Sequence, residues 1–596
     1  MKKILLATSI TLTTTLTHAT LGPIPIHLNT EYRTDSPVIG SIASTLTFDA
    51  NDIEATGANT FLEFLATIPS VGLFNVQGNV PAIFMRGNES DHTLVLIDGV
   101  RINDISSVGG AVGYGLKSMP LNDIEKIDII KGAGAVSYGA SAIAGVIAIT
   151  TKKAKKGEHI AISSKFGTHN ARTYALSASQ SDGNSFVRLT HNKYTTDGIN
   201  ARTIDITREK DGVSHYDTQI KLGNAYFNAS YLTSKSQTAY DQCGYPLVDN
   251  CVAHRGLNKI AVNINRQITP LWKSKLSLTQ SKTQVSTYEN DVVSIYSSDD
   301  YKSTDITLLN DIKITNAALN IGLSKTDDEN TTDQQKFSSK DLFINWQKNI
   351  NPINMDVNIG TRHIQHDEFG HKTIYSLGIG KTLETGVKLT ANYNTAFNAP
   401  SLYQASDNNN PTKLKAETSK NINLGLSKQH SWGGVNIALY KNTVDNLITY
   451  KSLSTSPWTD WYINEDKLTT QGIELSVNAN MAGYAIAFNH NYNKSRKNDA
   501  TTQSLRRPKN ITNFTLSKII GSFHSRIQLI NKSSSLDIGN VKLKGYTLLN
   551  LSTNYALNNN TKVLLNIKNA TDKDYTIANG FKQFGRTIEM GLKYKF

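Results

Sequence analysis

The chain of 596 residues lacks a long apolar run: no stretch approaches the roughly 18 consecutive apolar residues of a membrane-spanning helix. Hydrophobic residues make up 39% and mean hydropathy is −0.33, values that suit a soluble protein. A transmembrane β-barrel gives similar averages, because its strands alternate apolar and polar residues. A helical membrane protein is therefore excluded, while a soluble protein and a barrel both remain open.

Recognisable catalytic motifs are also lacking. The sequence has no zinc-protease histidine pair, no nucleophile elbow and no catalytic triad pattern. The glycine-rich residues 131–145 lack the lysine and hydroxyl of a phosphate-binding loop, and residues 110–118 (GAVGYGLKS) carry one residue too many before the lysine. Both segments are predicted to form tight turns, and the protein is predicted not to be an enzyme.

Cysteine is scarce, with only Cys243 and Cys251. The first 19 residues have the pattern of a secretory signal peptide: Lys2 and Lys3, an apolar stretch at 4–16, and a small-residue cleavage site at 17–19. In an exported protein the two cysteines favour one disulfide that closes a loop. The alternative, a metal-binding pair, would need further ligands.

Acidic residues do not balance the basic ones, and the net charge is +13. A nucleic-acid partner would be one explanation, but the basic residues are scattered and form no recognisable binding module. The charge is better explained by the solvated interior and loops of a barrel. No nucleic-acid partner is predicted.

What the sequence does contain changes character near residue 157. Before it, residues 59–68 have helical apolar spacing that stops at Pro69. Short apolar strands with turns between them are predicted at residues 82–85, 93–97, 124–130 and 146–151. This part is predicted to be a mixed α/β domain.

After residue 156 the pattern is strand, turn, strand to the end. In residues 546–557, Leu549, Leu551 and Tyr555 fall on one face and polar residues on the other; the last strand ends on Phe596 with the same alternation. Strands of about nine to eleven residues over this length predict an antiparallel transmembrane barrel of about 22 strands. A soluble sandwich is the weaker interpretation, because closure removes the edges that so many strands would expose.

Several segments, in order, resemble the signatures of the TonB-dependent outer-membrane receptors. In the first domain these are residues 83–87 (IFMRG), 94–104 (LVLIDGVRIND), 124–132 (IEKIDIIKG) and 136–151 (VSYGASAIAGVIAITT). In the barrel they are residues 397–400 (FNAP), 410–411, 414–417 (LKAE), 471–474 (QGIE) and 569–575 (NATDKDY). The resemblance covers the whole mature chain.

The resemblance implies a signal peptide at 1–19, a periplasmic extension at 20–30, a plug domain at 31–156 inside the lumen, and the barrel at 157–596. The protein would act as a monomer in the lipid of the bacterial outer membrane, without a catalytic cofactor. Arg86 is predicted to bridge to plug carboxylates or the barrel wall rather than to contact the ligand. The extension would pair as an added strand with the periplasmic TonB protein. That role falls to Pro23, Ile24, Pro25, Ile26, His27, Leu28 and Asn29; an extension without a role is the alternative.

Within the family, three loop segments resemble those of the cobalamin receptors: residues 209–212, 240–249 and 505–507. This implies transport of cobalamin or a related corrinoid, bound by the plug apex and outer loops. The implied substrate contacts are Val80, Ala82, Glu89, Ser106, Ser107, Val108, Gln242 and Arg506. The same loops imply a structural Ca²⁺, which takes six to eight oxygen ligands. Its ligands would be Asp197, Glu209, Asp211, Tyr240, Asp241 and Asp249; ordinary solvated turn residues are the alternative.

Other transport classes stay open. A ferric siderophore receptor is the main alternative, because its apical residues vary freely. A heme receptor is disfavoured because residues 401–409 contain no histidine. A passive porin or an adhesin would need neither the plug nor the coupling segment.

Overall fold

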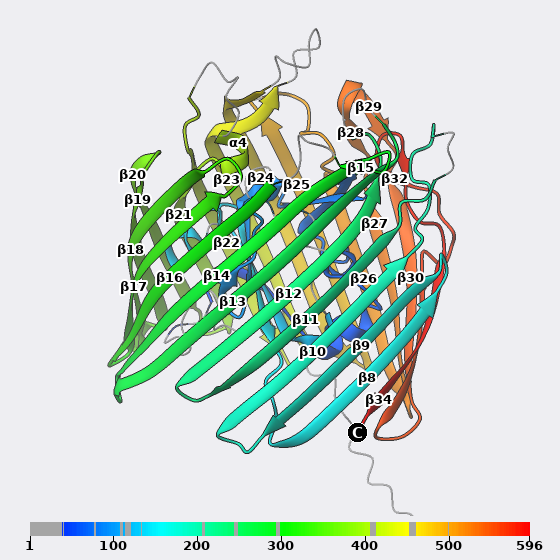
Figure 1. Ribbon diagram of the computed structural model, residues 1–596. Helices are drawn as coiled ribbons and strands as arrows, with labels where there is room; N and C mark the ends of the chain where they lie inside the picture. Colours follow the sequence, from blue (N-terminus) through cyan, green and yellow to red (C-terminus); the bar gives the residue numbers. More distant parts are fainter. Residues whose placement is uncertain are drawn as a thin grey trace, which may run out of the picture.

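A computed structural model describes residues 39, 41–76, 79–107, 111, 113, 121–132, 134–205, 209–243, 248–293, 299–405, 413–451, 461–498 and 500–596. Within these ranges a closed barrel surrounds an N-terminal plug, seen in blue through the strands (Figure 1).

The plug is built on a five-stranded sheet and a separate hairpin. The sheet has the order β1-β6-β7-β4-β5, in which β4 and β7 run parallel and the other neighbours antiparallel. Its strands are β1 (Ser44–Asp49), β4 (Thr93–Ile97), β5 (Val100–Arg101), β6 (Ile124–Lys131) and β7 (Gly145–Thr151); the hairpin is β2 (Val71–Val76) and β3 (Val80–Met85). The four plug strands predicted from the sequence are confirmed as parts of β3, β4, β6 and β7.

Short helices cover this sheet. α1 (Ala50–Ala55) begins at Asp49, whose side chain accepts hydrogen bonds from the first turn. α2 (Phe61–Leu65) confirms the helix predicted at 59–68 but is shorter, because Thr67 and Ile68 bond three residues back and tighten the chain before Pro69. α3 (Ala135–Tyr138) also belongs to the plug, whereas α4 (Leu402–Ala405) lies in the barrel part of the chain. None of the helices in the described part of the chain is long and apolar enough to cross a membrane.

The plug has its own apolar core. Phe61, Phe64 and Leu65 of α2 are fully buried against Ile127 and Ile147 of the sheet. This core lets the helix and the sheet pack as one unit inside the barrel.

The barrel has 22 strands in its closed ring over the described residues, and each pairs antiparallel with its neighbours, as predicted. The two-residue β15 (Val292–Val293) adds to β14. The ring strands are β8 (Gly157–Gly167), β9 (Ala171–Ser181), β10 (Ser185–Thr196), β11 (Val213–Asn224), β12 (Phe227–Tyr240), β13 (Cys251–Thr269), β14 (Trp272–Glu289), β16 (Asp299–Ile314), β17 (Ala317–Asn330), β18 (Gln335–Ile350), β19 (Met355–His366), β20 (Gly370–Thr382), β21 (Val387–Asn398), β22 (Glu417–His430), β23 (Gly433–Lys451), β24 (Trp461–Met481), β25 (Tyr484–Lys497), β26 (Asn510–Ile520), β27 (Phe523–Lys532), β30 (Tyr546–Ala556), β31 (Thr561–Lys568) and β34 (Thr587–Lys595).

Many strands are longer than the predicted nine to eleven residues, up to 21 in β24. Their pairing continues past the apolar band toward the end opposite the C-terminus, where small hairpins rise (Figure 1). These hairpins are β28 (Ser535–Asp537) with β29 (Val541–Leu543), and β32 (Thr576–Ala578) with β33 (Phe581–Lys582).

The two faces of the barrel have opposite chemistry. Outward-facing Ile260 and Leu323 are about half exposed, while Asn345, Gln347 and Thr470 are buried inside. Apolar residues outside and polar residues inside are typical of a barrel that faces lipid. At the end of the barrel where the C-terminus lies, the strands are joined by short turns, such as residues 225–226. At the other end the connections are longer, such as residues 569–586.

Candidate functional site

Arg86 fastens the plug to the barrel wall. It follows β3 and is 2% exposed. Its Nε and Nη2 donate to the two carboxylate oxygens of Glu474 at 3.1 and 2.7 Å, and Nη1 donates to Asn423 at 2.7 Å. Nζ of Lys131 also lies 2.8 Å from Glu474. The bridging role predicted for Arg86 is confirmed.

Gly87 follows Arg86, and a glycine is needed here because the barrel wall comes very close to the backbone. Its φ is 75°, and a Cβ there would lie 2.4 Å from Oδ1 of Asn493. Nδ2 of Asn493 donates to the Arg86 carbonyl at 2.6 Å, and Nε of Arg507 donates to the Gly87 carbonyl at 3.0 Å. The Arg-Gly pair is therefore a docking point for β25 and the connection after it.

His92 makes a second buried link. It ends the 3₁₀ turn η1 (Ser90–His92), and its Nε2 lies 2.9 Å from Oε2 of Glu417 on β22. Burial alone would lower the pKa of His92, but the carboxylates of Glu417 and Asp91 outweigh burial and raise it to about 9. His92 is therefore a cation at neutral pH, paired with the barrel.

The plug-binding groups Asn398, Glu417 and Glu474 all lie in barrel segments that carry the family resemblance. Ser141 of the plug donates to Asn398 at 2.9 Å. Sequence reasoning used these segments as family signatures and missed their contacts, because each partner lies more than 250 residues away along the chain. The one local signal was the placement of these polar groups at inward-facing strand positions.

Asn79, directly before β3 in the first apical segment, is held by the barrel at two points. Nδ2 of Asn79 donates to the backbone carbonyls of Asp211 and Ala239, both at 2.9 Å. Beside it, Val80 packs against the apolar cluster around the disulfide, and Ala82 packs into a second cluster shared by plug and barrel. Both predicted contact residues therefore lie at the junction of plug and outer loops.

The second apical segment is anchored to β13. Nη1 of Arg255 reaches Asp104 at 2.6 Å and Ser106 at 2.7 Å. The Ser107 hydroxyl donates to the Asp104 carbonyl at 2.7 Å. The structure thus brings Ser106 and Ser107 into one small network; Val108 lies outside the described residues.

The charged residues predicted to contact substrate are held in ion pairs. Nη2 of Arg507 donates to Glu89 at 2.5 Å. Burial would raise the pKa of Glu89, but the Arg507 guanidinium outweighs it and lowers the pKa to about 2. Arg506 pairs with the buried Asp537 of β28. Gln242, with φ at 59°, sits directly before the disulfide.

Three of the predicted calcium ligands converge. Carboxylate oxygens of Glu209, Asp211 and Asp241 all lie within 4.8 Å of one another, and Asp211 and Asp241 are buried. Burial and the neighbouring carboxylate of Asp211 raise the pKa of Glu209 to about 7 and that of Asp241 to about 8. The oxygens of these three carboxylates, two of them from buried residues, lie close enough together to hold a cation. We call these three residues the acidic cluster.

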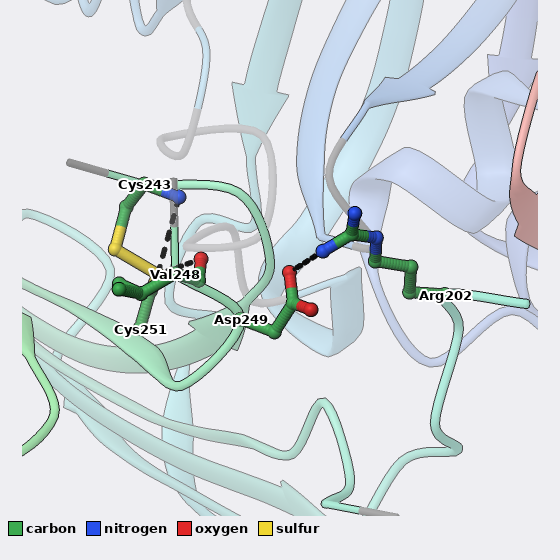
Figure 2. Close-up of a disulfide and its surroundings, with 5 residues drawn as sticks. All are labelled: Arg202, Cys243, Val248, Asp249 and Cys251. Carbon is green, nitrogen blue, oxygen red and sulfur yellow. Dashed lines mark hydrogen bonds and ion pairs between the residues drawn. A yellow bond between two sulfur atoms is a disulfide. The ribbon is translucent and has the colours of Figure 1, made fainter. Parts of the chain in front are cut away.

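The other predicted ligands are not part of this group. Asp249 forms an ion pair with Arg202 (Figure 2). Asp197 accepts a hydrogen bond from Asn170 at 3.2 Å and is largely exposed. Tyr240 packs in the apolar cluster around the disulfide.

The disulfide joins Cys243 and Cys251, with a Cα–Cα distance of 6.1 Å. Figure 2 shows it beside Val248, whose backbone exchanges hydrogen bonds of 3.1 and 2.9 Å with that of Cys243. The predicted disulfide is therefore present, and it sits beside Val80 of the plug.

Residues 156–570 match the family model of the TonB dependent receptor-like β-barrel, and residues 37–146 match that of the TonB-dependent receptor plug domain. The chain belongs to the TonB-dependent receptor family. It is therefore a TonB-dependent transporter of the bacterial outer membrane. The long connections of this TonB-dependent receptor face outward and its short turns face the periplasm.

Two curated relatives share its length. The chain is 26% identical over 605 residues to the vitamin B12 transporter BtuB of Photobacterium profundum, covering 95% of each protein. It is 26% identical over 471 residues to the vitamin B12 transporter BtuB of Vibrio vulnificus, covering 75% of this chain and 74% of the relative.

Solved structures with the same fold bear different names. The siderophore receptor PirA from Acinetobacter baumannii is 18% identical with a TM-score of 0.78, covering 93% of this chain and 98% of PirA. The copper transporter OprC is 13% identical with a TM-score of 0.79, covering 93% of this chain and all of OprC. At these identities the likeness shows the fold of the TonB-dependent receptor and leaves its substrate open.

The family implies a TonB partner and a ligand. The segment predicted to bind TonB, from Pro23 to Asn29, precedes the described part of the receptor.

Proposed function

We propose that this receptor carries cobalamin or a related corrinoid inward across the outer membrane, as a monomer and without catalysing a reaction. The ligand would bind between the plug apex and the outer loops, with Val80, Ala82, Ser106, Ser107 and Val108 below it. Glu89, Gln242 and Arg506 would surround it.

The observation that carries this proposal is the pairing of the charged apical side chains. Glu89 is paired with Arg507, Arg506 with Asp537, and Asp104 with Arg255. Among the described apical residues, this leaves small apolar residues, hydroxyls, backbone groups and charges neutralised in ion pairs for contact. Such a surface suits a large neutral ligand with many amides better than a multiply charged iron chelate, which would need unpaired basic side chains.

The curated relatives support the same ligand, because two vitamin B12 transporters align with most of the chain. The solved siderophore and copper proteins share only the fold at 18% and 13% identity. A ferric siderophore is therefore the alternative that the first experiment has to exclude.

We further propose that Ca²⁺ binds at the acidic cluster. Glu209, Asp211 and Asp241 would supply carboxylate oxygens, with Asp249 nearby and backbone or water oxygens completing the shell. A cation there would relieve the mutual repulsion of the three carboxylates and join loop 197–212 to loop 241–250. Asp197 and Tyr240 would act outside the shell, as supports of these loops.

Energy for release would come through TonB. Residues 23–29 would pair with TonB as an added strand, and the inner-membrane proton-motive force would then rearrange the plug. The two prolines of this segment remove backbone donors, so the pairing would be made by the residues around them.

The test is equilibrium binding of radiolabelled cyanocobalamin to the detergent-purified receptor, with Ca²⁺ and with excess EDTA. Tight binding that is lost on chelation supports both the corrinoid and the cation site. Tight binding indifferent to chelation keeps the corrinoid and contradicts calcium. No binding to folded receptor in either condition overturns the corrinoid in favour of an iron chelate.

A further inference from the structure

The inner surface of the barrel is chemically divided. On the wall of β10–β17 the plug is held by ion pairs: Arg188 of β10 lies 2.6 Å from Asp123, and Asp328 of β17 lies 2.8 Å from Arg101. Such pairs are costly to open one partner at a time, because each leaves a charge buried without its partner. This part of the plug is therefore tightly fixed.

The opposite wall, β22–β26, holds the plug mainly through asparagine side chains. Its amide groups donate to backbone carbonyls and to one plug amide: Asn442 to Asn88 at 2.7 Å, Asn491 to Pro69 at 3.3 Å, Asn493 to Arg86 at 2.6 Å, and Asn513 to Thr67. We call the inward-facing asparagines of β22–β26 the asparagine wall. Three charged groups of the described part of these strands also pair with the plug: Glu417 with His92, Glu474 with Arg86 and Lys131, and Lys497 with Glu89.

Below these contacts the asparagine wall continues into a cavity of about 610 Å³ between the barrel and β1, at the periplasmic end. Asn478 of β24 and Asn489 of β25 line it, together with hydroxyl and apolar groups. Charged groups line it as well: Lys131 is paired with Glu474 at 2.8 Å and Lys388 with Asp356 at 2.9 Å, and Asp52, His524 and Arg526 complete the set. The cavity therefore offers neutral amides and hydroxyls beside a few charged groups.

We propose that the asparagine wall and its cavity are a second ligand surface, over which a neutral, amide-bearing corrinoid passes the plug; this rests on the proposed function. An amide side chain both donates and accepts, so it can exchange a plug carbonyl for a ligand amide without leaving a charge unpaired. Once TonB has opened the pairs of Glu417 and Glu474, the ligand passes along these amides, and the cavity receives it before release.

The experiment replaces the two cavity asparagines in the full-length receptor. Asn478→Leu/Asn489→Leu removes donors and acceptors at similar size, and Asn478→Gln/Asn489→Gln retains them. The control is Asn228→Leu on β12, where Asn228 pairs with Asn263 at 3.0 Å on the opposite wall and at the same end. For each, binding of labelled cyanocobalamin to purified receptor and its initial uptake by cells are measured.

We expect the receptor with Asn478→Leu/Asn489→Leu, the leucine pair, to bind cyanocobalamin normally. Its uptake should be slower by at least about fivefold, the effect of losing one or two hydrogen bonds. The glutamine pair and Asn228→Leu should transport at the wild-type rate. Uptake unchanged in the leucine pair, or slowed equally in Asn228→Leu, overturns the proposed surface. If the wild-type receptor does not bind cyanocobalamin, the proposed corrinoid function is overturned instead.

A second measurement does not depend on folding of the leucine pair. Both native cysteines are in the disulfide, so Asn489→Cys adds a single free thiol facing the cavity. Its labelling by a maleimide should be slowed by cyanocobalamin only in cells that contain TonB. Labelling that ignores the ligand contradicts passage through this cavity.

Discussion

At the scale of single residues, Asn79 connects the plug to the acidic cluster. Its side-chain amide donates at 2.9 Å to the carbonyl of Asp211, a member of the cluster, and to that of Ala239 near the end of β12, two positions before Asp241. The next residue, Val80, is a proposed ligand contact. Ordering of the two loops by a cation would therefore also order the plug turn under the ligand.

Asn79→Ala should weaken both calcium and cyanocobalamin binding, each by about 1–2 kcal/mol, because two hydrogen bonds between plug and loops are lost. Calorimetric titration of the purified receptor measures both affinities. Asn51→Ala, an exposed change on α1, is the matched control and should alter neither. If Asn79→Ala leaves both affinities intact, the turn does not depend on the loops.

His92 should make attachment of the plug sensitive to alkaline pH. Its pKa, raised from 6.5 to about 9, means that its pairing with Glu417 stabilises the folded state fully below about pH 6.5. This stabilisation is lost as the pH rises through about 9. The urea midpoint for release of a spin-labelled plug should therefore fall between pH 7.5 and 9.5.

The variant His92→Gln provides the comparison. It should release the plug at lower urea at pH 7.5, because Glu417 loses its charged partner; breaking such a buried pair costs about 3–5 kcal/mol. Its midpoint should then vary less with pH than that of the wild type. Equal pH dependence in the two proteins would assign the effect to other groups.

At the scale of elements, the disulfide makes a rigid support of the loop after β12. The half-cystines pack with Tyr240 of β12 and Ala253 of β13 against Val80 of the plug. Cys243 and Cys251 are eight positions apart. A closed loop of this size needs little further ordering when the ligand or a cation arrives.

Cys243→Ser/Cys251→Ser should lower cyanocobalamin affinity by roughly tenfold, since closing a loop of this size is worth about 2–3 kcal/mol of chain entropy. The loss should be larger in EDTA than in saturating Ca²⁺, because the cation orders the same loops. Barrel stability, followed as heat-modified mobility in detergent gels, should not change. An equal loss with and without Ca²⁺ would show that the two supports act independently.

At the scale of the whole molecule, a closed barrel filled by a plug cannot be a simple pore. Ion pairs and amide contacts join the plug to opposite walls, and its links to Glu417 and Glu474 are fully buried. Passage of a large ligand therefore needs work on the plug. The outer membrane supplies none, and the TonB partner of the family provides the route for it.

Deleting residues 20–30 should abolish cyanocobalamin uptake and leave equilibrium binding intact, because none of these residues is a proposed ligand contact. Uptake by intact cells and binding to purified receptor measure the two effects. Cells without TonB should reproduce the uptake defect with the wild-type receptor. Uptake that survives the deletion would point to a passive porin.

The alternation of residues by itself determined the barrel. Period-two patterns such as Leu549, Leu551 and Tyr555 are local, and they indicated both the strands and the lipid-facing side. The ordered family motifs determined the compartment and the transport class, while the signal peptide stays a prediction. The plug strands followed in the same way, because short apolar runs between turns have few alternatives.

Only the tertiary structure decided which side chains meet. Arg86 and Glu474 are 388 positions apart, and their contact depends on the closure and register of the barrel. For the same reason the acidic cluster contains Glu209, Asp211 and Asp241, whereas Asp249 pairs with Arg202. Alternation assigns a residue to the inside or outside of the barrel, but strand register and the packing of the plug select its partner.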